Sequence, residues 1–162
     1  MAAEPTARIA ITPAEGAADV ALVRDLFLEY ADWLGFDLCF QGFEDELATL
    51  PGKYAPPAGG LWLARVAGAP AGVVGLRPLE GGVCELKRLW VRPDFRGHGL
   101  GRRLTETAIA AGRAAGQRAM CLDTIGSQMA AAGALYRALG FRETAPYYHN
   151  PHPEVLYMEL AL

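Results

Sequence analysis

The sequence predicts a single α/β domain built on a mixed β-sheet with helices on both faces. Its 162 residues suit one domain. Hydrophobic residues make up 52% of the chain and charged residues 20%, an ordinary globular balance. The expected elements run strand, two helices, three consecutive strands, and then helices alternating with strands. The consecutive strands indicate an antiparallel meander, and the later strand–helix–strand unit adds a parallel pair.

The N-terminal part is expected to form a strand, two helices and a loop, at 8–11, 13–34, 40–50 and 51–60. Thr12 is a suitable cap for the first helix, and Pro13 fits its first position. Apolar residues at helical spacing continue this helix, and Gly35 ends it. The Pro- and Gly-rich loop precedes strands that have to pack on these helices, so it does not separate two domains.

The remainder is expected to form strands at 61–66, 71–76, 83–91, 118–125 and 155–160, and helices at 100–115 and 128–139. The segment Ala67–Pro70 is a hairpin signal between the first two of these strands. Gly140 is expected to end the last helix. Strands from the whole chain are therefore expected to form one sheet, with the helices packed on its faces.

Charge and cysteine content exclude several classes of partner. The formal net charge is −3 and no Lys/Arg run exceeds a pair, which argues against a nucleic-acid partner. Cys39, Cys84 and Cys121 are far apart, so reduced thiols are expected rather than disulfides or a zinc site. The segment 1–10 lacks the pattern of a signal peptide, and no apolar run is long enough to span a membrane. We therefore expect a soluble, cytoplasmic protein.

The most informative segment, residues 89–101, leads from a strand through a glycine-rich loop into a helix. Gly97, Gly99 and Gly101 alternate there, exposing backbone N–H groups at a helix N-terminus, and Arg96 adds a cation suited to phosphate. A nucleotide P-loop requires Lys-Ser/Thr after its last glycine, and a dinucleotide fingerprint requires glycine at the position of Arg102. Neither of these patterns is met.

This loop resembles the acyl-CoA pyrophosphate loop of the GNAT acetyltransferases, Arg/Gln-x-x-Gly-x-Gly/Ala, through Arg96, Gly99 and Gly101. The segment 85–91 is similar to the fourth strand of that family, and 134–141 to its last helix and following turn. The resemblance implies one GNAT domain over 1–162. Its mixed, mostly antiparallel central sheet would have about six to seven strands, flanked by about four helices.

The resemblance also implies acetyl-CoA as cosubstrate, with the fourth strand pairing with its pantetheine arm. The implied cofactor-binding residues are Leu89, Trp90, Val91, Arg96, Gly97, His98, Gly99, Leu100, Gly101 and Arg102. Many members of the family carry an Asn seven residues before the catalytic tyrosine, where this chain has Met129. The contact of that Asn is then lost, or Ser127 or Gln128 supplies it.

Two residues are candidates for proton transfer. Tyr136 matches the family tyrosine that faces the CoA sulfur, so it is a candidate general acid. Its alternative role is a core residue with a hydrogen-bonded hydroxyl. Glu85 lies early on the fourth strand, sharing a face with Lys87, Leu89 and Val91, and is a candidate general base. Its alternative role is an ion pair with Lys87.

The acceptor pocket is expected between the first helix and the segment 146–153, with contacts from Tyr30, Trp33, His149 and Asn150. Aromatic residues at helical spacing also fit the core, and 146–153 also fits a rigid surface loop. His149 and His152 form an HxxH pair with too few ligands for a metal site, so no metal is expected.

The sequence therefore predicts an N-acetyltransferase that moves acetyl from acetyl-CoA to a primary amine of a small or amino-acid-like molecule, by direct transfer in a ternary complex. One alternative acceptor is a protein N-terminus or lysine. Another alternative is a non-catalytic acyl-CoA-binding domain. No nucleic-acid or membrane partner is expected, and a homodimer is left open.

Overall fold

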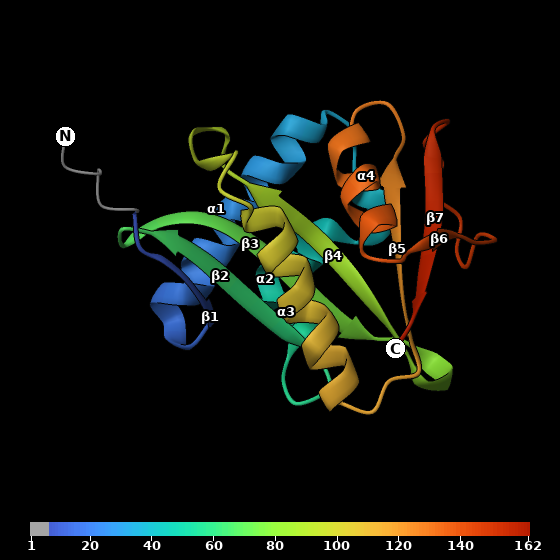
Figure 1. The fold of residues 1–162 in the computed structure, drawn as a ribbon, viewed down its shortest axis with the longest axis horizontal. Helices are drawn as coiled ribbons and strands as arrows, with labels where there is room; N and C mark the ends of the chain where they lie inside the picture. The colour runs from blue at the N-terminus through green and yellow to red at the C-terminus, as the bar shows by residue number, and fades with distance from the viewer. Residues whose placement is uncertain (1–6) are drawn as a thin grey trace.

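A computed structural model describes residues 7–162 (Figure 1). The segment 1–6, which belongs to the stretch interpreted as lacking a signal peptide, lies outside the described residues. The seven-stranded sheet has the order β1-β2-β3-β4-β5-β7-β6. Its strands are β1 (Ile9–Pro13), β2 (Gly60–Val66), β3 (Ala69–Pro78), β4 (Val83–Val91), β5 (Ala119–Ile125), β6 (Arg142–Glu143) and β7 (Val155–Ala161). Only β4 and β5 pair in parallel, which confirms the predicted mixed, mostly antiparallel sheet.

The α-helices are α1 (Gly16–Leu34), α2 (Phe43–Thr49), α3 (Leu100–Ala114) and α4 (Ala130–Ala138). They divide between the two faces of the sheet (Figure 1). One core cluster contains buried residues of α1 and α2 together with side chains of β2, β3 and β4. The other contains buried residues of α3 and α4 with the opposite face of the sheet. Each helix thus buries its apolar stripe against the sheet, as the sequence pattern predicts.

The start of α1 differs from the prediction. Thr12 and Pro13 belong to β1, where they pair with Leu63 and Trp62, and the helix begins only at Gly16. Because β1 is an edge strand, a proline without an N–H group is tolerated there. Glu15 occupies the N-cap position without a side-chain cap hydrogen bond, and its N–H donates to the carboxylate of Asp19 in the first turn at 3.0 Å.

Two further elements differ from the sequence-based boundaries. The helix expected at 40–50 is interrupted at Gly42, which has φ +67° and separates a 3₁₀ turn at 39–41 from α2. Strand β6 was missed because it is only two residues long. The end of α1 at Gly35, with φ +66°, agrees with the predicted stop.

A β-bulge interrupts β4 where it pairs with β3. Lys87 pairs with Gly75 and Trp90 with Val73, so two residues of β4 lie opposite one residue of β3. The bulge residue Arg88 has φ +60°, a conformation that is uncommon for a residue with a side chain. The backbone is therefore strained here, beside the cavity described below.

The bulge corrects the predicted alternation along β4, in which Glu85, Lys87, Leu89 and Val91 share one face. Beyond Arg88 the pattern reverses. Leu89 and Val91 pack on the α3/α4 side, whereas Trp90 belongs to the core beneath α1 and α2. The extra residue shifts the two-residue period by one position.

The sheet opens between its two central strands. β4 and β5 pair only through Val83–Glu85 and Ala119–Cys121, near their N-terminal ends. Beyond these pairs the strands diverge toward the N-terminus of α3 (Figure 1). Beyond Glu85 and Cys121, the two central strands of the sheet are therefore no longer hydrogen-bonded to each other.

Candidate active site

A cavity of about 420 Å³ lies where β4 and β5 diverge. Its lining comes from Leu86–Val91 of β4, Asp123–Ile125 of β5, the loop before α3, α4 and the end of α1. The chain thus contributes widely separated segments to one enclosure. This placement is typical of ligand sites in open α/β sheets.

One end of the cavity is suited to an anion. Gly97 and Gly99 have φ +87° and +72°, and a Cβ added to either would meet no atom within 4 Å. The first backbone N–H groups of α3 point out of the helix without acceptors among residues 7–162. Arg96 lies with its guanidinium 5.2 Å from the Trp90 ring centre. Backbone donors, a helix dipole and a cation therefore converge on one place.

Most of the expected cofactor residues line this cavity: Leu89, Trp90, Val91, Arg96, Gly97, Gly99, Leu100 and Gly101. His98 and Arg102 do not. The side chain of His98 is exposed, and Arg102 forms an exposed ion pair with Glu106 at 2.9 Å. The positions of these two side chains therefore do not support the prediction that they bind the cofactor. The backbone of Arg102 still belongs to the first turn of α3, which lies at the cavity.

Tyr136 combines a buried ring with an available hydroxyl. The ring packs in the core beside Phe141, with ring centres 5.6 Å apart. The residue lines the cavity, and its hydroxyl has no hydrogen-bond partner among the residues described. Burial raises the pKa of Tyr136 well above its ordinary value. The phenol therefore stays neutral and can donate a hydrogen bond into the cavity.

Met129 occupies the position where many members of the family carry an asparagine, and its side chain contacts the protein's own backbone and Thr124. Its Sδ accepts hydrogen bonds from the Thr124 hydroxyl and the Ile125 N–H, both at 3.3 Å, so the thioether faces its own turn. Of the two expected substitutes, Gln128 lines the cavity and donates to the Trp33 and Leu34 carbonyls at the end of α1. Ser127 donates to Glu154 at 2.6 Å.

Glu85 is fully buried and does not line the cavity. Its carboxylate accepts hydrogen bonds from Arg77 at 2.6 Å and from the Tyr147 hydroxyl at 2.5 Å, and Lys87 lies 3.9 Å away. Burial raises the pKa of Glu85, but the cations Lys87 and Arg77 outweigh it and hold the pKa below its ordinary value. This geometry favours the ion-pair interpretation of Glu85 over a base that meets the acceptor.

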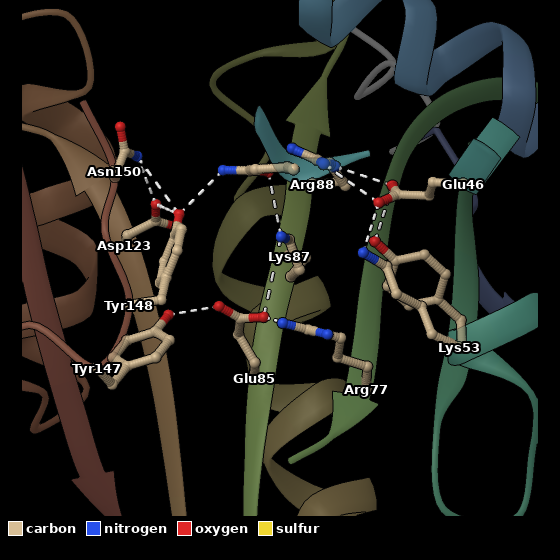
Figure 2. A network of polar contacts seen from close by, with 12 residues as sticks. Glu46, Lys53, Arg77, Glu85, Lys87, Arg88, Asp123, Tyr147, Tyr148 and Asn150 are labelled. Atoms are coloured by element: carbon tan, nitrogen blue, oxygen red, sulfur yellow. Dashed lines mark hydrogen bonds and ion pairs between the residues drawn. The ribbon is translucent and has the colours of Figure 1, made fainter. Parts of the chain in front are cut away.

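Asp123 is the carboxylate that does line the cavity. Its Oδ2 accepts hydrogen bonds from the Tyr148 hydroxyl and, at 2.8 Å, from the Asn150 amide (Figure 2). Its Oδ1 has no partner within residues 7–162. Sequence reasoning missed Asp123, although a single carboxylate in the apolar strand β5 was an available signal.

A polar relay connects Asp123 to β4 (Figure 2). The Gln41 amide donates to the Tyr148 hydroxyl at 2.9 Å, and its Oε1 accepts from the Lys87 ammonium at 3.1 Å. Burial, helped by the neighbouring Arg88, lowers the pKa of Lys87 to about 8. Lys87 and Gln41 both line the cavity, and neither was predicted as a site residue.

The bulge residue Arg88 is held by a buried acid on α2. Its guanidinium donates to both oxygens of Glu46, at 3.0 and 3.2 Å, and Tyr54 and Lys53 contact the same carboxylate. Burial raises the pKa of Glu46, but Arg88 and Lys53 outweigh it and lower the pKa to about 2. The charge of Arg88 is therefore neutralised locally, and α2 fixes the bulge.

The expected acceptor residues are only partly brought together. Tyr30, Trp33 and Asn150 line the cavity. His149 is exposed and is not part of the lining, because the segment turns Asn150 and Tyr148 inward instead. Burial raises the pKa of Tyr30 to about 12, so it too is a neutral polar group.

Within residues 7–162, no three His, Cys, Asp or Glu side chains gather as a metal site. None of the helices described is both long and apolar enough to cross a membrane.

Comparisons with known proteins identify the family and the fold. Residues 23–141 match the model of the acetyltransferase (GNAT) family. An uncharacterized N-acetyltransferase of Schizosaccharomyces pombe is 44% identical over 139 residues, covering 85% of each chain. A GNAT-family acetyltransferase structure from Staphylococcus aureus has a TM-score of 0.78 at 20% identity, covering 95% of this chain and 99% of that one. A Salmonella typhimurium acetyltransferase, solved with acetyl-CoA, has a TM-score of 0.65 at 22% identity, covering 94% and 93%.

Proposed function

Because the chain belongs to the GNAT acetyltransferase family, we propose that it transfers the acetyl group of acetyl-CoA to a primary amine of a small molecule, directly within a ternary complex. One observation carries the proposal. A single cavity joins the N-terminus of α3, the hydroxyl of Tyr136 and the carboxylate of Asp123. An anion site, a proton donor and a proton acceptor thus face the same space.

The residues present fit acetyl-CoA. Its pyrophosphate would lie at the first turn of α3, near Gly97, Gly99 and Arg96. Its pantetheine arm would lie along β4 beyond Glu85, where β4 does not pair with β5. When bound, acetyl-CoA supplies an activated acetyl group and a thiol leaving group. Holding both reactants in one enclosure contributes to the rate by orienting them.

Proton transfer is assigned to two residues. We propose that Tyr136 donates its proton toward the leaving sulfur, because its hydroxyl is neutral and unbonded. An alkylamine with a pKa of about 10.4 is protonated at neutral pH and has to lose a proton. We assign that proton to Asp123, which lines the cavity and whose Oδ1 has no partner among the residues described, rather than to Glu85, whose oxygens are bonded to Arg77 and Tyr147.

The shape of the acceptor end favours a small molecule over a protein. Aromatic side chains of α1 and the inward-turned Asn150 line it, and the cavity volume of about 420 Å³ lies in the range of small-molecule sites. The available acid and base argue against a non-catalytic binding domain. Cys39, Cys84 and Cys121 are free thiols, which fits the reducing cytoplasm as the proposed location.

The test is an amine screen that follows thiol release from acetyl-CoA, with mass spectrometry of the product. The expected result is stoichiometric CoA and N-acetylated product for at least one small amine. Acetyl-CoA binding without turnover of any small amine would contradict the proposal and favour a binding domain. Acetylation of peptides alone would contradict the small-molecule assignment.

A further inference from the structure

We propose that the acceptor amine also carries a carboxylate, so that the substrate is an amino-acid-type zwitterion. Its carboxylate would bind Lys87 and Gln41, and its ammonium would bind Asp123. This inference rests on the proposed function, because it assigns a substrate class to the same cavity. It follows from two oppositely charged groups that are incompletely satisfied within the fold.

Lys87 is the first of these groups. Its side chain is only 5% exposed, yet its ammonium has a single hydrogen-bond acceptor among the residues described, Gln41 Oε1 at 3.1 Å. Glu85 lies at 3.9 Å, too far for a hydrogen bond. A lysine ammonium has three N–H donors, and a buried cation is costly unless it is paired. Lys87 lines the cavity, so a ligand there can accept hydrogen bonds from the remaining donors.

Asp123 is the second group. Tyr148 and Asn150 both donate to Oδ2, which leaves Oδ1 for a cation in the cavity. The side chains that donate to Asp123 are neutral, so its carboxylate has no hydrogen-bonded cation and an ammonium is a suitable partner. Asp123 also contributes to the electrostatic environment of Lys87, which places the two charges within interaction range.

The number of cationic side chains not neutralised within the fold favours a carboxylate over a phosphate as the anionic group of the acceptor. Arg88 is neutralised by Glu46, and Arg77 is paired with Glu85. Arg96 lies at the other end of the cavity, against Trp90 and Trp33. Lys87 shares the Glu85 carboxylate with Arg77, at the longer distance of 3.9 Å, and is therefore only partly neutralised. It is the partly neutralised cation of this part of the cavity lining among the residues described. One positive charge matches the single charge of a carboxylate better than the larger charge of a phosphate.

Gln41 connects the two charges, and the second N–H of its amide group would donate to the anion. Its amide group donates to Tyr148 and its oxygen accepts from Lys87, so both ends of the side chain are fixed. Tyr30, Phe36 and Leu38 line the same region and supply apolar walls for the body of the acceptor. A zwitterion with an apolar body fits this combination of contacts.

The first experiment compares matched acceptors in the thiol-release assay with wild-type enzyme. The panel contains α-amino acids, ω-amino acids of increasing chain length, the corresponding amides, the decarboxylated amines and the aminophosphonates. The expected result is a preference for the carboxylate over its amide of roughly tenfold to a hundredfold in kcat/KM, the scale of a charged hydrogen bond. The chain length that works best reports the separation of the two binding groups.

Two variants then assign the preference to its residues. Lys87→Met removes the cation at similar length, and Gln41→Glu supplies Lys87 with an internal carboxylate. Both are expected to reduce the acid-to-amide ratio to about one. Lys53→Met is the matched control, because Lys53 pairs with Glu46 and does not line this cavity, so the ratio is expected to stay as in wild type. Circular dichroism and an acetyl-CoA-induced melting shift verify folding of each variant.

The outcomes separate the two proposals. Turnover of acids and amides at equal rates, or a preference for amides, decarboxylated amines or polyamines, overturns the acceptor assignment and leaves the acetyltransferase function standing. A preference for aminophosphonates also overturns it. A wild-type preference that persists in folded Lys87→Met and Gln41→Glu overturns the role of these residues. No turnover of any amine overturns the proposed function and this inference together.

Discussion

At the residue scale, the site depends on which side chains have their hydrogen-bonding capacity already used. Tyr136 and Asp123 line the cavity, and the Tyr136 hydroxyl and Asp123 Oδ1 have no hydrogen-bond partners among the residues described. Glu85, in contrast, is bonded to Arg77 and Tyr147. A group that is already paired has little freedom to exchange a proton with a substrate. The proposed acid and base are therefore the unpaired groups.

Tyr136→Phe removes the proposed general acid and retains the packed ring. Because the hydroxyl bonds no other described residue, we expect little change in folding stability or in acetyl-CoA affinity. Turnover should fall by roughly tenfold to a thousandfold, the scale of general acid catalysis. Single-turnover kinetics measures the chemical step, and an unchanged rate in that step would return Tyr136 to the role of a core residue.

Asp123→Asn and Glu85→Gln distinguish the two candidate bases. In Asp123→Asn the proton acceptor is gone, so activity should drop strongly and recover partly as pH rises and more amine is neutral. Glu85→Gln should keep the low-pH limb of the kcat/KM profile, because Glu85 lies outside the cavity lining. The measurement is the pH dependence of kcat/KM for both variants. Loss of that limb in Glu85→Gln alone would restore Glu85 as the base.

At the element scale, the β4 bulge is the feature that shapes the site. It reverses the side-chain alternation at Arg88, three residues beyond the last β4–β5 pair at Glu85. Gly75 on β3 leaves room for Tyr54, which donates to the Glu46 carboxylate that holds Arg88. A Cβ at Gly75 would come within 2.8 Å of the Tyr54 ring. α2, β3 and β4 therefore cooperate to hold one strained residue.

Glu46→Gln tests this support. Removing one partner of a buried ion pair leaves Arg88 uncompensated, so the free energy of unfolding should fall by about 3 kcal/mol or more. The pKa of Glu46 is lowered to about 2, so its stabilisation is complete above a pH of about 4.5 and is lost as pH falls toward 2. Urea unfolding across this pH range should show a weaker pH dependence in the variant.

The control for this experiment is Glu143→Gln. Glu143 pairs with Arg137 at 3.1 Å, but both side chains are more than half exposed. Such a pair contributes about 1 kcal/mol or less. Equal losses in the two variants would contradict a structural role for the buried Glu46–Arg88 pair.

The loop before α3 is the second element to test. Arg96→Ala combined with Gly99→Asp removes a cation and places a carboxylate at the helix N-terminus, so calorimetric binding of acetyl-CoA should be lost. Gly116→Asp is the matched control, because Gly116 has φ +76° and no atom within 4 Å of an added Cβ, and it follows the other end of α3. Normal binding by the double variant would refute the loop assignment.

At the scale of the whole molecule, the site lies between two parts of one sheet. β1 to β4 form an antiparallel meander on one side, and β5, β7 and β6 form the other. The short parallel pairing bridges them near the cavity, together with contacts such as Gln41–Tyr148 and Tyr147–Glu85. A ligand between β4 and β5 would add a further connection between the two parts.

Acetyl-CoA is therefore expected to stabilise the whole fold. At a concentration one hundred times Kd, binding to the native state alone contributes about 2.7 kcal/mol, which raises Tm by several degrees. Hydrogen exchange should show protection along β4 beyond Glu85, in β5 and at the start of α3. Protection confined to edge strands β1 or β6 would place the ligand outside the cleft.

The regular elements and the anion loop were accessible from the sequence because each rests on local rules. Glycines ended α1 and opened α3 where expected, and Tyr136 was recognised within its own helix. The start of α1 could not be predicted from the sequence, because the pairing of Pro13 with β2 outweighed the preference of proline for a helix N-terminus. The choice between Glu85 and Asp123 also depended on partners distant in the chain.

The sequence by itself determined the fold class, the order of the elements and the glycine loop proposed to bind phosphate, since periodicity, glycines and capping act over a few residues. Only the tertiary structure decided which charged side chains are paired within the fold and which can still bind a ligand. Glu46 and Arg88 are 42 residues apart and neutralise each other, and Tyr147 satisfies Glu85 across 62 residues. Gln41 reaches Lys87 and Tyr148 from a third segment. Pairing and burial set the state of each charged group, and both arise when distant segments pack together.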